Sequence, residues 1–137
     1  MRQDATGPAD SCAVMKNLPP EALDKVADYF RALSEPTRLH ILNLLRAGER
    51  NVGELAEATS YMAANVSRHL ALLTQQGLVR RVARGTCAYY SIADDSVYAL
   101  CDVVCGSIAR QHERTAEHGR LFASVVPQAA RRRRKSG

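Results

Sequence analysis

The hydrophobic spacing of this chain changes once, at Leu78, and that change restricts the folds available to it. Before Leu78, apolar residues recur every three or four positions in four successive segments, which is typical of amphipathic helices. After it, two short β-prone runs at 78–82 and 88–92 flank 83–86, where Gly85 supplies a turn, and this pattern predicts a hairpin. Helical spacing returns from Val97 onward. The predicted order is four helices, a hairpin and a final helix.

Residues that cap or end helices mark the boundaries of these segments. Ser34 and Ser96 are expected to cap the second and the last helix. Asn51, followed three residues later by Glu54, predicts a capping box at the start of the short third helix. Gly77 is expected to end the fourth.

Length and composition favour one soluble domain. The chain has 137 residues, of which 46% are hydrophobic and 24% charged, and no apolar run approaches the length that a membrane span needs. Asp4 and Asp10 stand where a secretory signal would carry positive charge. We therefore expect a cytoplasmic protein without a membrane segment. It should have a flexible N-terminal arm at 1–18, one domain at 19–120 and a flexible basic tail at 121–137.

The basic charge of the chain is unevenly distributed. The formal net charge is +5, and the basic residues at 131–135 account for all of it, so the rest of the chain is neutral. Within that neutral part, residues 58–93, here called the acid-free segment, contain no Asp or Glu but include Arg68, Arg80, Arg81 and Arg84. This concentration of positive charge on the fourth helix and the hairpin indicates a surface that approaches phosphates. An ordinary solvated basic face is the alternative interpretation.

The fourth helix has a face suited to a DNA groove. If Val66, Leu70 and Leu73 face the core, Arg68 lies on the opposite face among small residues. Small side chains would let the helix approach the groove wall while Arg68 reaches a guanine edge or a phosphate. His69 flanks the buried positions, so it is as readily a packed, hydrogen-bonded residue as a DNA contact.

Four motifs in order carry a resemblance to a known family. They are the segments at 32–42 (ALSEPTRLHIL), 52–56 (VGELA), 65–70 (NVSRHL) continued by 77–79 (GLV), and 84–86 (RGT) with 89–91 (YYS). Together they resemble the ArsR/SmtB family of winged-helix transcriptional repressors over about 20–110. The resemblance implies a mainly α winged helix-turn-helix fold with a β-hairpin wing at about 78–93 and a recognition helix at about 62–76. It also implies a homodimer paired through the first and last helices, and repression at a double-stranded DNA operator that an inducer relieves. An enzyme is not expected.

The resemblance implies that six residues of the fourth helix occupy the usual DNA-reading positions of the family, and the arginines of the hairpin complete the expected DNA contacts. These are Ala63, Ala64, Asn65, Ser67, Arg68, His69, Arg80, Arg81 and Arg84. Met62 departs from the family pattern, because members commonly place a capping serine there.

The cysteines suggest how an inducer would be sensed. Cys101 and Cys105 are four residues apart, so on a helix their thiols project from one face about 6 Å apart. A soft divalent metal or trivalent arsenic or antimony could bridge such a pair. Cys12 is the third candidate ligand, and Cys87 and His112 are alternatives to it.

Other interpretations of the cysteines stay open. Cys101 lies within an apolar stripe of the last helix, so both thiols could simply pack. A thiol-redox or persulfide response is a further alternative, as is a DNA-binding protein without an inducer. None of the ligand sets typical of the family is present in full. DNA binding itself needs no cofactor in any of these cases.

Overall fold

The structure is a computed structural model, and it describes residues 14–112. Its elements are η1 (Val14–Asn17), α2 (Pro20–Ala32), α3 (Pro36–Leu44), η2 (Leu45–Ala47), β1 (Arg50–Asn51), α4 (Val52–Thr59), α5 (Ala63–Gln75), β2 (Val79–Arg84), β3 (Cys87–Ile92) and α6 (Ser96–Gln111). The chain divides after Ala93 into two units, and α6 belongs to the second. The predicted order of helices and hairpin is confirmed.

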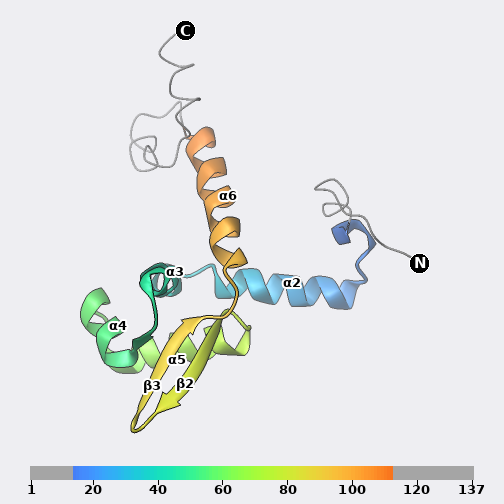
Figure 1. Cartoon of the computed structure of the whole chain (residues 1–137). Coiled ribbons are helices and arrows are strands. Elements are labelled where there is room, and N and C mark those ends of the chain that lie inside the picture. The colour runs from blue at the N-terminus through green and yellow to red at the C-terminus, as the bar shows by residue number, and fades with distance from the viewer. Residues whose placement is uncertain (1–13, 113–137) are drawn as a thin grey trace. The chain divides into compact units, whose positions relative to one another are not determined.

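The first unit is a small helical core with a β-hairpin beside it. Helices α3, α4 and α5 contact one another, and β2 contacts α5 (Figure 1). The fully buried side chains include Ile41 of α3, Leu55 of α4, and Val66, Leu70 and Leu73 of α5. The inward face expected for the fourth helix is therefore confirmed.

The strands form a three-stranded antiparallel sheet in the order β1-β3-β2. The hairpin register pairs Val79 with Ile92 and Arg84 with Cys87, so the connection is only Gly85 and Thr86. The four-residue connection expected at 83–86 is wrong, because Gly85 has a φ of +61° and lets two residues reverse the chain. The sequence pattern also missed β1.

Two of the expected helix caps are wrong. Oε1 of Glu35, rather than Ser34, accepts the backbone N–H groups of Thr37 (2.7 Å) and Arg38 (3.2 Å). Ser34 instead donates its hydroxyl hydrogen to the carbonyl of Arg31 at the end of α2. In the second unit, Oδ1 of Asp94 accepts from the Ser96 amide (2.9 Å), so α6 begins at Ser96 and is not capped by its side chain.

The two other predicted helix boundaries are confirmed. The capping box of Asn51 and Glu54 is present at the start of α4, and Gly77 follows α5 with a φ of +77°. Residues 1–13 of the predicted arm, residues 113–120 of the predicted domain and the whole predicted tail (121–137) lie outside the described residues.

Helix α6 shows both buried and exposed apolar residues. Val97 and Ala109 are buried, whereas Val103 and Val104 expose 67% and 44% of their surface. No helix within residues 14–112 combines the length and the apolar character that crossing a bilayer requires.

Candidate nucleic-acid interface

The outward face of α5 is made of small residues around one arginine. Ala64, Ser67, Arg68 and Ala71 are all exposed, and this agrees with the face expected from the sequence. A guanidinium N–H of Arg68 donates to Oδ1 of Asn65, one turn earlier on the same helix. Because a guanidinium carries five N–H donors, this bond orients Arg68 and leaves donors for another acceptor.

The start of α5 is apolar and lacks a side-chain cap. Met62 is the N-cap residue, with the extended backbone that an N-cap requires (φ −70°, ψ 143°), but its thioether makes no capping hydrogen bond. Met62 exposes 78% of its surface, and Ala63 and Ala64 beside it are also exposed.

His69 is the one expected contact that the structure buries. It exposes only 8% of its surface, whereas the other expected contacts are exposed or half-buried. Its Nδ1 lies 3.1 Å from a terminal guanidinium nitrogen of Arg38, and its Nε2 lies 4.0 Å from Oε1 of Glu35. Burial lowers the pKa of His69, so the ring is predominantly neutral at pH 7.

The three arginines of the hairpin differ in their surroundings. Arg80 and Arg81 are exposed, and Arg80 donates to the carbonyl of Ala93 (3.3 Å). Arg84 pairs with both carboxylate oxygens of Glu49, and its guanidinium carbon lies 5.2 Å from the centre of the Tyr89 ring. The positive charge near the turn is therefore partly neutralised.

Sequence reasoning missed the partners that hold this surface. Glu49 lies outside the acid-free segment, so a count along the chain could not pair it with Arg84, 35 residues later. Arg38 and Glu35 lie within the motif at 32–42, and the motif alone gives no sign of their contacts with His69. One signal was available for Arg38, because an arginine in a largely apolar helix needs partners.

Of the cysteines considered as metal ligands, three lie within the described residues and one does not. Cys101 and Cys105 are half-buried on α6, Cys87 is exposed at the start of β3, and Cys12 lies outside the described residues. Within the described part of the chain, no three His, Cys, Asp or Glu side chains are close enough to form a metal site.

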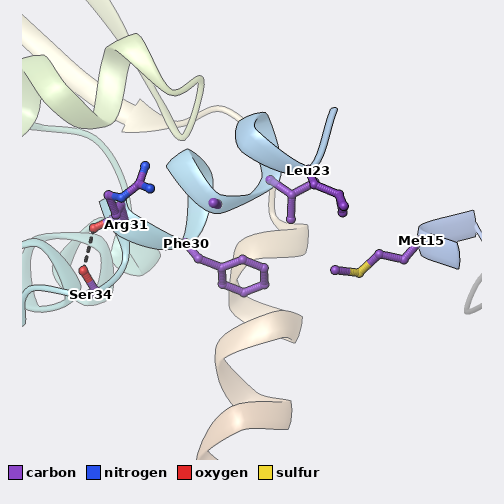
Figure 2. Close-up of a pocket in the computed structure, with 7 residues that line it drawn as sticks. Met15, Leu23, Phe30, Arg31 and Ser34 are labelled. Carbon is purple, nitrogen blue, oxygen red and sulfur yellow. Dashed lines mark hydrogen bonds between the residues drawn. The ribbon is translucent and has the colours of Figure 1, made fainter. Parts of the chain in front are cut away.

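An apolar hollow lies along α2. Met15, Leu23, Val26, Ala27 and Phe30 line it together with Arg31 and Ser34, and its volume is about 460 Å³. Met15, Leu23 and Phe30 turn toward the same space in Figure 2. Leu23 and Phe30 expose 40% and 47% of their surface, so this apolar side of α2 is largely open in a single chain.

Comparison with known proteins assigns a family model to the centre of the chain. Residues 35–81 match the model described as "Bacterial regulatory protein, arsR family". The transcriptional repressor SdpR of Bacillus subtilis is 36% identical over 63 residues, which are 46% of this chain and 70% of SdpR. A probable mercury resistance operon repressor of Streptomyces lividans is 38% identical over 77 residues, which are 56% of this chain and 62% of that repressor.

A solved structure gives the same fold. The homodimeric winged helix-turn-helix DNA-binding domain of Mb0332 from Mycobacterium bovis is 37% identical, covers 64% of this chain and 87% of that chain, and has a TM-score of 0.58. The match spans 38% of the length of the transcriptional regulator Rv0324 of Mycobacterium tuberculosis and 64% of that of KmtR from the same organism.

Proposed function

Because this chain belongs to the ArsR family of bacterial regulatory proteins, we propose that it is a homodimeric, DNA-binding transcriptional repressor of the bacterial cytoplasm. The family is regulatory rather than catalytic. One observation carries the proposal: the exposed face of α5 consists of small side chains around Arg68 and lies within 36 residues that contain no acidic group.

The α5 face suits the major groove. A recognition helix enters that groove and reads base edges with residues near its N-terminus. Ala63, Ala64 and Ser67 are small enough to let the α5 backbone approach the bases, while Arg68, oriented by Asn65, can donate to the O6 and N7 atoms of guanine.

The hairpin would add contacts with the sugar-phosphate backbone. Arg80 and Arg81 are exposed on β2 and available to phosphates. Arg84 would have to exchange its partner Glu49 for a phosphate oxygen. We assign His69 an indirect role, because its side chain lies on the buried side of α5.

A second copy of the chain would cover the apolar hollow of α2. Leu23 and Phe30 on α2 are large apolar residues that are exposed in a single chain, and Val103 and Val104 are likewise exposed on α6. Exposed apolar patches of this kind mark surfaces that bind a partner. These features support pairing through the first and last helices. The homodimeric state of Mb0332 is consistent with it.

The DNA-binding proposal is tested with Arg68→Ala. Duplexes are first selected from a random pool with the wild-type protein, and affinity is then measured by fluorescence anisotropy. We expect affinity to fall about 5- to 150-fold, the cost of losing one good base contact. Lys25→Ala is the matched control, because it removes one exposed positive charge from α2, outside the acid-free segment. Unchanged affinity of a folded Arg68→Ala dimer would refute the assignment of α5 as the recognition helix.

The inducer forms a second part of the proposal. Cys101 and Cys105, one turn apart on α6, could bind trivalent arsenic or antimony or a soft divalent metal, with Cys12 as a third ligand. A related repressor carries mercury resistance in its description, and mercury is a thiol-seeking metal. A thiol-redox or persulfide response, or packing alone, is the competing function.

Titration of the protein–DNA complex separates these cases. Arsenite, cadmium ion and a persulfide donor are added separately, and release of DNA is followed by anisotropy. Release by one agent that is lost in both Cys101→Ser and Cys105→Ser, but kept in Cys87→Ser, would identify the thiol pair as the sensor and the agent as its class. Release by none of the three would contradict the sensor.

A further inference from the structure

Arg38 joins the end of α2 to α5 through a single side chain. Its Nε donates to the carbonyl oxygen of Ala32 (2.7 Å), and one terminal nitrogen donates to that of Arg31 (3.1 Å). Both carbonyls belong to the last turn of α2. The other terminal nitrogen lies 3.1 Å from Nδ1 of His69, in the middle of α5. The two helices are thus connected by one rigid, planar group.

The chemistry of this connection fixes the state of His69. A guanidinium can only donate hydrogen bonds, so Nδ1 of His69 must be the acceptor and the ring proton must be on Nε2. That nitrogen lies 4.0 Å from Oε1 of Glu35. Glu35 is itself held by the amides of Thr37 and Arg38, which lower its pKa although partial burial raises it.

The geometry of the connection matters for a dimer that reads two half-sites. His69 directly follows Arg68, so the bond from Arg38 to its ring holds the part of α5 that carries the proposed base contact. Helix α2 carries the apolar face assigned above to the second copy. Any change of angle between α2 and α5 in one protomer is repeated by symmetry in the other, which alters the distance between the two recognition helices.

Building on the proposed function, we propose that Arg38 is a positioning residue that sets the orientation of α5 relative to α2 and thereby the half-site spacing that the dimer accepts. Recognition helices of such dimers enter successive major grooves about 34–36 Å apart, and one base pair changes that distance by about 3.4 Å. A rigid α2–α5 connection should reject such a change, and a loosened one should tolerate it.

Arg38→Lys and His69→Leu break the connection in different ways. Lysine keeps the positive charge but cannot reach three acceptors in the planar arrangement of a guanidinium. Leucine is apolar and offers Arg38 no acceptor. His69→Gln is the conservative variant, because its amide oxygen can still accept from Arg38.

The experiment measures affinity for the selected duplex and for versions with one base pair inserted or deleted between the half-sites. We expect the wild-type protein to lose about tenfold or more on either change, comparable to a mismatched base pair. In Arg38→Lys and His69→Leu this loss should shrink to about threefold or less, and His69→Gln should restore most of the wild-type ratio. Lys25→Ala should keep the wild-type ratio.

A role in stability alone would lower affinity for all three duplexes equally and leave the ratios unchanged, and that result would overturn the inference. Circular dichroism and size-exclusion chromatography verify that each variant is a folded dimer. If Arg38→Lys does not fold, the comparison of His69→Leu with His69→Gln decides. A selection in which the wild-type protein enriches no duplex would refute the proposed function, whereas a wild-type protein that binds all three spacings equally would refute only the role of Arg38.

Discussion

Replacing Met62 by serine should stabilise the protein. Met62 has the backbone of an N-cap residue but offers no oxygen to the amides in the first turn of α5. A serine hydroxyl there could accept from the N–H of Asn65, three residues on, and such caps stabilise a helix by about 1 kcal/mol. Because Met62 is already 78% exposed, only about a fifth of its surface is buried. Losing the apolar contacts of that fifth costs about 0.3–0.6 kcal/mol. The expected net gain is about 0.5 kcal/mol.

The matched control for this prediction is Met62→Ala. Alanine loses the same apolar contacts but provides no cap, so it should be less stable than the wild type by a few tenths of a kcal/mol and less stable than Met62→Ser by about 1 kcal/mol. Urea unfolding followed by circular dichroism measures both differences, provided that the slope with urea is unchanged. Equal stability of the serine and alanine variants would refute the reasoning, because the two differ chiefly in the capping oxygen.

Three further predictions concern the first unit. Since burial lowers the pKa of His69 below its ordinary value of 6.5, the free energy of unfolding should be undiminished above pH 6.5. It should fall as the pH drops below that value, by at most about 1.4 kcal/mol per pH unit. Urea unfolding measured across this pH range should show a shallower fall in His69→Gln than in the wild type. Parallel pH dependence of the two proteins would contradict the prediction. Leu70→Ala, at a fully buried position, should lose about 2–5 kcal/mol of unfolding free energy, and a loss below about 1 kcal/mol would show that the site relaxes around the deletion. Glu49→Gln should weaken the hold on Arg84 and thereby raise affinity for DNA at low salt, whereas a lower affinity would show that the pair supports binding.

Local patterns in the sequence were sufficient for most of the fold. The spacing of apolar residues predicted the helices, the change at Leu78 predicted the hairpin, and the Asn51–Glu54 capping box was predicted from two residues. These features depend on neighbours within one or two turns of chain. The exposed face of α5 follows from the same periodicity.

What the sequence did not predict depends on contacts between distant segments. The cap of α3 is an exception, because it depends on a local choice: Ser34 bonds back to Arg31, three residues earlier, and Glu35 takes the cap position. Strand β1 is only two residues long and exists because Arg50 and Asn51 pair with β3. The sequence left open whether His69 is packed or contacts DNA, and its hydrogen-bonding partner Arg38 lies 31 residues earlier.

The ion pair between Glu49 and Arg84 changes how the effect of salt on this protein should be read. For a simple DNA-binding surface, the fall of affinity with salt concentration counts the phosphates that are neutralised. Here one cation already has an anionic partner within the protein. DNA binding at Arg84 would therefore exchange one ion pair for another, and the freed Glu49 would take up a cation that offsets one of those released from the DNA. The salt dependence of DNA affinity would therefore give about one phosphate contact too few per protomer. A contact between Arg84 and the DNA backbone would contribute little to the measured slope.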